Sequence, residues 1–130
     1  MTCDYEFSAG TEATVYLGYD NAVTLVPYED ISERTFYDMS QATGVTVQAD
    51  PSPNLVQGDS ISATSADVPT TVWWEQVGTT DEWRLHIKVG LFVGMVAGEY
   101  LLRVIIFDAA HPNGWILTDA DVVVTVVGTP

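Results

Sequence analysis

Hydrophobic and polar residues alternate almost without interruption between Glu82 and Val89. Two sets of side chains take turns along this segment: Trp83, Leu85, Ile87 and Val89 on one face, and Arg84, His86 and Lys88 on the other. Successive side chains of a pleated strand leave on opposite faces, so a period of two predicts a half-buried β-strand. The three basic residues are therefore expected to point outward.

The segment from Tyr100 to Phe107 is apolar on both faces except at Arg103. Such a run is typical of a central strand in a two-layer sandwich. Between the two strands, Gly90 to Ala97 is expected to form a connector with one helical turn.

Five further segments predict strands, and a weaker one at 13–19 predicts a short strand. The five are Ala22–Tyr28, Thr43–Ala49, Ser60–Thr64, Thr70–Glu75 and Trp115–Val127, the last kinked or bulged near Asp119. Pro27 suits an edge position, because proline cannot donate to a strand ladder. Loops are expected at 50–54 and 78–81, and a tight Asn-Gly turn at His111–Gly114.

This spacing predicts an all-β fold, an antiparallel Ig-like β-sandwich of roughly seven to nine strands. Its interior should hold the inward positions of the three best-defined strands: Leu85, Ile87, Val89, Tyr100, Leu102, Val104, Ile106, Val122, Val124 and Val126. We expect residues 1–20 to form an N-terminal arm or short lead-in strand, and 21–130 to form the sandwich. Residues 1–12 have no periodic apolar face and should add little stability.

The composition fits one domain with its own core. The chain has 130 residues, 47% of them hydrophobic, and four tryptophans. No apolar run reaches the roughly 18 residues of a membrane helix, so membrane insertion is not predicted. The first residues carry no basic start and no apolar run, so a secretory signal is not expected either. Cys3 is the only cysteine, which excludes an internal disulfide and fits synthesis in a reducing cytosol.

Charge is the extreme feature of the composition. Eighteen acidic residues oppose four basic ones, for a formal net charge of −14. Such a surface repels nucleic acid and anionic lipid. Acidic residues also favour solubility, which is the simplest interpretation. The sharper one is a surface that must avoid DNA or meet a basic partner.

The sequence offers little support for catalysis. Neither His86 nor His111 adjoins a nucleophile in a recognisable motif, and His86 is expected to be a solvated surface residue. His111 should shape the turn before Pro112. Asp108, Asp119 and Asp121 could gather around a hard cation, but solvated aspartates are the favoured interpretation. We therefore expect that the protein is not an enzyme and that it binds no cofactor and no metal.

Two tryptophans are candidates for an interface. Trp73 and Trp74 are sequential and must face opposite sides of a strand. Trp74 is the better core candidate, which leaves Trp73 outward as a sugar-stacking platform or an interface anchor. Trp115, next to Gly114, is ambiguous between core and surface. The candidate interface residues are thus Arg84, His86, Lys88, Trp73 and Trp115.

A tryptophan followed some 25 residues later by Gly98-Glu99-Tyr100 resembles the immunoglobulin arrangement. The resemblance implies that Trp74 and Tyr100 take the places of the strand C tryptophan and the corner tyrosine. Leu102 then stands where the second cysteine of a disulfide-bonded domain would be.

A second resemblance covers most of residues 20–127. Its motifs are 25–30 (LVPYED), 38–43 (DMSQAT), 97–100 (AGEY) and 108–114 (DAAHPNG), followed by a valine-rich end. This order is similar to small Ig-like accessory proteins of tailed bacteriophage virions, and to N-terminal domains of phage baseplate upper proteins. It implies a non-enzymatic structural protein of a virion, made in the host cytoplasm.

Within that class we expect a capsid decoration or accessory protein on the outer surface, with a neck, tail or baseplate position next. Its partners would be major capsid or tail proteins, without nucleic acid or membrane, and the isolated domain would be monomeric. The alternative is a carbohydrate- or receptor-binding module that uses Trp73 or Trp115. Contacts with the particle are expected through the face of Arg84, His86 and Lys88.

Overall fold

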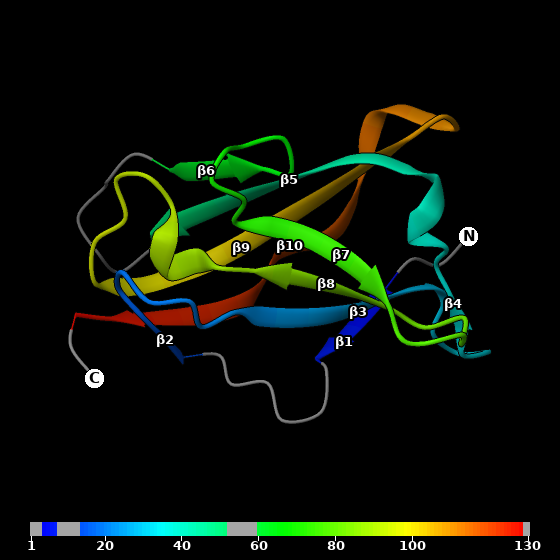
Figure 1. Cartoon of the computed structure of the whole chain (residues 1–130), viewed down its shortest axis with the longest axis horizontal. Coiled ribbons are helices and arrows are strands. Elements are labelled where there is room, and N and C mark those ends of the chain that lie inside the picture. Colours follow the sequence, from blue (N-terminus) through cyan, green and yellow to red (C-terminus); the bar gives the residue numbers. More distant parts are fainter. Residues whose placement is uncertain (1–3, 8–13, 52–59, 129–130) are drawn as a thin grey trace.

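A computed structural model describes residues 4–7, 14–51 and 60–128, without the side chains of residues 4 and 119–121. Cys3 lies outside the described residues, as does most of the predicted loop at 50–54. The described chain is all-β, with two short 3-10 turns (Figure 1). In chain order the elements are β1 (Asp4–Phe7), β2 (Thr14–Tyr16), β3 (Val23–Asp30), β4 (Thr35–Phe36), η1 (Met39–Gln41), β5 (Ala42–Pro51), β6 (Ile61–Thr64), β7 (Val72–Gln76), β8 (Trp83–Ile87), η2 (Val89–Leu91), β9 (Gly98–Asp108) and β10 (His111–Val127).

The strands form two sheets, as the sequence predicts. One sheet has the order β1-β3-β8-β7, with β4 also paired to β3, and the other has the order β2-β10-β9-β5-β6. All described pairings are antiparallel except β2 with β10, which is parallel. The orders A-B-E-D and G-F-C are those of immunoglobulin sandwiches, so β3, β8, β9 and β10 take the places of strands B, E, F and G. The Ig-like β-sandwich is confirmed. No helix of the described residues has the length and hydropathy to cross a membrane.

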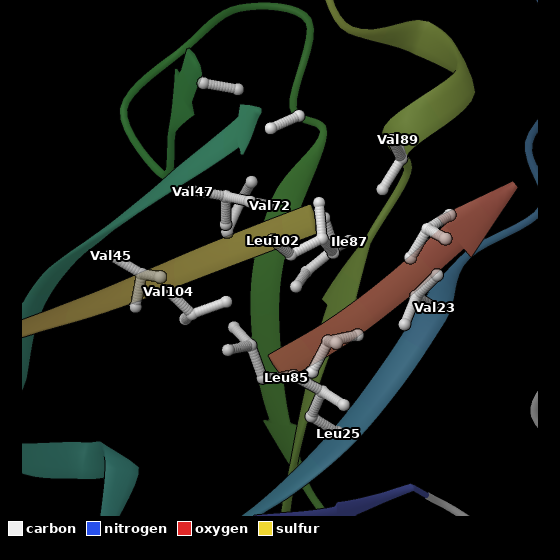
Figure 2. Close-up of a cluster of buried hydrophobic side chains, with 14 of the residues drawn as sticks. Val23, Leu25, Val45, Val47, Val72, Leu85, Ile87, Val89, Leu102 and Val104 are labelled. Carbon is white, nitrogen blue, oxygen red and sulfur yellow. The ribbon is translucent and has the colours of Figure 1, made fainter. Parts of the chain in front are cut away.

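The core lies between the two sheets, and Trp83, on the inward face of β8, is partly buried against it. Figure 2 shows side chains of β3, β7 and β8 pointing toward those of β5 and β9. All ten predicted interior residues are buried, and Leu85, Ile87, Leu102 and Val104 have no exposed surface. The strand register inferred from the sequence is therefore correct for β8, β9 and the end of β10.

The corner expected of an immunoglobulin fold is present at Tyr100. Its hydroxyl donates a hydrogen bond to the carbonyl of Val96, 2.8 Å away, just before β9 begins. Leu102 fills the second cysteine's place with a fully buried side chain. The position given to Trp74 is wrong, because Trp74 lies on β7 in the other sheet. The neighbour of β9 in the strand C position is β5, whose inward residues are Val45, Val47 and Ala49.

The N-terminal segment is not a separate arm. Within its described residues, β1 pairs with β3 in one sheet and β2 pairs with β10 in the other. Val15 is only 1% exposed, and Glu6 accepts a 2.6 Å hydrogen bond from the Tyr28 hydroxyl. β2 confirms the short strand expected at 13–19. β1 was missed because a strand of four residues is too short to show a period, and the neighbouring strand supplies its stability.

Pro27 does not lie on a sheet edge, since Tyr5 of β1 faces it across the ladder. The N–H and C=O of one strand residue point to the same side. The Pro27 carbonyl accepts a hydrogen bond from the Tyr37 N–H at 3.1 Å. The proline nitrogen, which has no hydrogen to donate, therefore points to the same side, toward β4, where the pairing is irregular. An internal strand tolerates proline there because no ladder bond is lost.

The tight turn predicted at His111–Gly114 occurs earlier, at 109–110. His111 already pairs with Asp108, and the Asn113-Gly114 pair lies in a register shift between His111 and Trp115. Gly114 has a φ of 85°, so its permissive backbone forms a bulge instead of a turn. The predicted irregularity near Asp119 is confirmed by another register shift, between Asp119 and Val122.

Candidate functional site

Four of the five candidate interface residues lie together on the outer face of β7 and β8, with Lys88 directly after the end of β8. Trp73 is directly opposite His86, and their rings stack with centroids 4.9 Å apart. The Lys88 ammonium lies 5.1 Å from the Trp73 ring centroid, within cation–π range. Arg84 lies on the same face, opposite Glu75. The alternation thus identified a real cluster.

His86 is not the solvated residue that the sequence predicts. Its side chain is 15% exposed, its Nδ1 lies 2.9 Å from Thr24 Oγ1, and its Nε2 lies 2.9 Å from Glu75 Oε1. Cross-strand neighbours cover it, which a single strand's pattern cannot reveal. Both ring nitrogens are engaged, and the ring itself stacks on Trp73.

Every lysine and arginine of the chain is ion-paired with one of its own carboxylates. The pairs are Arg34–Glu6 at 3.1 Å, Arg84–Glu82 at 3.1 Å, Lys88–Asp20 at 3.1 Å and Arg103–Asp50 at 3.7 Å. With Glu75 beside His86, the β7–β8 cluster therefore carries at least as much negative as positive charge. It is not an uncompensated basic patch, which weakens the prediction that particles dock there through its cations.

Trp115, the fifth candidate, is a core residue and not a surface platform. It is 9% exposed and meets Tyr37 edge to face, with centroids 4.9 Å apart. The bulge at Gly114 turns the indole inward, and its Nε1 donates to Asp108 Oδ2 at 3.3 Å. The sequence could not assign Trp115 to the core or to the surface, because a bulge changes which face each following residue points to.

Asp108 is the centre of a buried polar network. The Tyr37 hydroxyl donates to its Oδ2 at 2.5 Å, the His111 backbone N–H donates to Oδ1 at 2.7 Å, and His111 Nδ1 lies 2.9 Å from Oδ1. These donors, Tyr37 first, lower the pKa of Asp108 from its ordinary 3.8 to about 2. The network connects the end of β9 with the start of β10 and the segment before η1. His111 thus closes the turn at 109–110 through Asp108, and not the turn at His111–Gly114 in which the sequence placed it.

Asp108 should contribute to stability in a pH window set by its lowered pKa. A carboxyl with a depressed folded-state pKa stabilises the fold above its unfolded pKa, and that contribution is lost as pH falls through the folded pKa. Asp108→Asn should therefore lower Tm at pH 7, and the difference from wild type should shrink between pH 4 and pH 2. Thermal scans across this range measure it, with Asp81→Asn at an exposed carboxyl as the control. An Asp108→Asn deficit that stays constant down to pH 2 would contradict the assignment.

A groove of about 500 Å³ lies beside Lys88, at the end of β8. It is lined in part by Asp67, Thr71, Lys88 and Phe92. Thr71 is 7% exposed, and its hydroxyl has no hydrogen-bond partner among the described residues. Such a groove can accept a side chain of a partner, but the polar groups in it do not specify one.

The sequence missed an apolar surface on the opposite sheet. The outward residues of β9 include Leu101, Ile105 and Phe107, and those of β10 include Ile116 and Val123. Ile116 is 50% exposed and Val123 is 44% exposed. The signal was visible, because the run 100–107 is apolar on both faces while only one face of a sandwich strand meets the core.

No group of three potential metal ligands occurs among the residues whose side chains are described. The side chains of Asp119 and Asp121 lie outside that set, so the suggested cluster with Asp108 is untested. Comparison with known proteins adds no family: no protein-family model matches the chain, and no curated protein matches it.

Proposed function

We propose that this chain is a non-enzymatic structural protein of a tailed-phage virion, a decoration or accessory protein on the outer surface of the capsid. A position on the neck, tail or baseplate of the particle is the next alternative. The resemblance of its turn and strand-start motifs to Ig-like virion proteins suggests this class. An Ig-like sandwich is compatible with it, although the same fold serves many functions.

The carrying observation is the distribution of charge. All four cations are neutralised within the chain, so fourteen formal negative charges remain without a cationic partner of its own. This field repels the phosphates of packaged DNA and favours a partner that supplies basic residues. It also opposes self-association, so we expect the free domain to be monomeric at low salt. An outer position on the particle satisfies both requirements.

The geometry of the described polar groups also supports a non-enzymatic role. His86 is held by Thr24 and Glu75, and His111 is held by Asp108. The Thr24 hydroxyl beside His86 belongs to a residue that is only 9% exposed, so a substrate has little access to it. The carbohydrate-binding alternative is less well supported. Trp115 is buried, and the Trp73 ring is contacted by the His86 ring and by the Lys88 ammonium, which leaves less aromatic surface for a sugar ring.

Mass spectrometry of gradient-purified particles tests the proposal. We expect the chain at a reproducible copy number relative to the major capsid protein. Limited proteolysis of intact particles should release it, whereas a protein inside the shell would be protected until the capsid opens. Absence from purified particles would contradict the virion assignment. Protection together with the genome would contradict the outer position.

A further inference from the structure

We propose that the outer face of β9 and β10 is the docking surface of this chain, and that its occupant is a virion protein surface with an apolar centre and a cationic rim. This inference rests on the proposed function and names the surface and the partner chemistry. It differs from the sequence-based expectation, which placed the contact on the opposite sheet at Arg84, His86 and Lys88.

The apolar side chains of this face come from two neighbouring strands and lie on either side of Arg103. Leu101 is directly opposite Val123, and Ile105 is directly opposite Ile116. Directly opposed side chains on one face of an antiparallel pair are within contact distance of each other. These two pairs, with Phe107 beyond Ile105, form a stripe of large apolar side chains, in which Ile116 and Val123 are exposed and Leu101, Ile105 and Phe107 are half-buried. Exposed apolar patches of this kind mark interaction surfaces more often than isolated exposed residues do.

Gly114 helps to shape this stripe. A Cβ atom at this position would lie 2.5 Å from Ile105 Cγ2 and 3.0 Å from Phe107 Cε1. The absence of a side chain therefore lets Ile105 and Phe107 lie over the β10 backbone. The bulge that buries Trp115 thus also shapes the outer surface, so the two faces of the hairpin are set by one backbone feature.

The rim of the stripe is polar, with an exposed carboxylate at Glu99 and a second carboxylate, Asp50, that pairs with Arg103. Glu99 lies on the same face as Leu101 and is exposed, and Asp50 of β5 is directly opposite Leu101. Arg103 interrupts the stripe, but it lies 3.4 Å from Gln48 Oε1 and 3.7 Å from Asp50 Oδ2. Since this chain's cations are engaged with its own carboxylates, complementary positive charge must come from the partner.

A second copy of this chain fits the surface poorly. Two copies would each bring a net charge of −14 and place the same acidic rims beside each other. Like charges brought together across an interface are costly. A basic partner gains from the same rim, and that attraction weakens with salt because the Debye length is about 10 Å at 0.1 M. Charge complementarity therefore selects a different protein over self-association.

Rebinding of the purified chain to particles that lack it tests the surface. The variant Ile116→Thr/Val123→Thr removes apolar contact while keeping β-branched residues that suit strands. We expect about tenfold or greater loss of affinity, the size expected when central apolar anchors are removed from an interface. The matched control is Val93→Thr/Val96→Thr, which alters valines that are 94% and 62% exposed but lie outside the stripe. We expect this control to bind as wild type does.

Two further measurements separate the outcomes. Arg84→Gln/Lys88→Gln tests the opposite sheet, and we expect little change in its binding. Circular dichroism and Tm establish that each variant is folded, and sedimentation equilibrium reports oligomeric state. If the wild type does not bind particles, the proposed function fails and this inference fails with it. If it binds but Ile116→Thr/Val123→Thr binds equally well, or if Arg84→Gln/Lys88→Gln alone loses binding, only this inference fails. A wild-type dimer that the stripe variant dissociates would identify a second copy as the occupant and overturn the heterologous partner.

Discussion

Replacing Leu102 by alanine is expected to lower the free energy of unfolding by about 2–5 kcal/mol, the usual range for a buried leucine. Leu102 has no exposed surface and lies on β9, which pairs with β5 on one side and β10 on the other. In Figure 2 its side chain lies among Val47, Val72 and Ile87, from both sheets. Strands of both sheets surround this side chain, so the neighbouring residues can move little to fill the cavity that alanine would leave.

Leu101→Ala is the matched control for this prediction. Leu101 precedes Leu102 on β9, but its side chain lies on the outer face and is only partly buried. Its truncation should cost distinctly less, since less surface is buried and solvent fills the space. Urea unfolding of both variants measures the difference. A loss below roughly 0.5 kcal/mol at Leu102 would mean that the register of β9 is wrong.

Replacing Gly90 by alanine is expected to cost about 1–3 kcal/mol, the range for inserting atoms into a packed interior. A Cβ at Gly90 would lie 2.3 Å from the Tyr16 carbonyl oxygen and 3.1 Å from the Tyr16 carbonyl carbon. Both are backbone atoms and cannot rotate away. The Gly18 N–H also donates to the Gly90 carbonyl at 2.9 Å, so the added methyl must separate η2 from the end of β2.

Gly44→Ala is the control for Gly90→Ala. A Cβ there would meet only Ser65 Oγ, at an ordinary 3.6 Å, so we expect a smaller change. Hydrogen exchange should show faster exchange of the Leu17 amide, which donates to the Val127 carbonyl at 2.8 Å. Equal stability of the two variants would contradict the close approach of η2 to β2, and with it the docking of β2 beside β10.

The fold class and most of the core could be predicted because they depend on local periodicity. A period of two assigns each side chain to a face, and this holds wherever a strand is long and free of bulges. Leu85, Ile87 and the inward residues of β9 were placed in this way. Tyr100 could also be placed, since the Gly-x-Tyr segment that opens β9 is a local signal.

The candidate site was predictable only in part. The same periodicity brought Trp73, His86 and Lys88 to one outer face. It could not show that Glu75 contacts His86 or that Asp20 contacts Lys88. These partners are 11 and 68 residues away in the sequence and come from other segments of the chain. The burial of Trp115 could not be predicted, because the bulge at Gly114 changes which face the following residues point to.

The sequence by itself determined the alternating strands, the interior of the sandwich and the strongly acidic charge. The tertiary structure alone decided which strands are neighbours, so it added β1 and β2 to the sheets and placed Pro27 inside one of them. It also decided which cations are neutralised and which apolar face is left uncovered. Periodicity follows from the geometry of one strand, whereas pairing, neutralisation and coverage depend on contacts between residues distant in the chain.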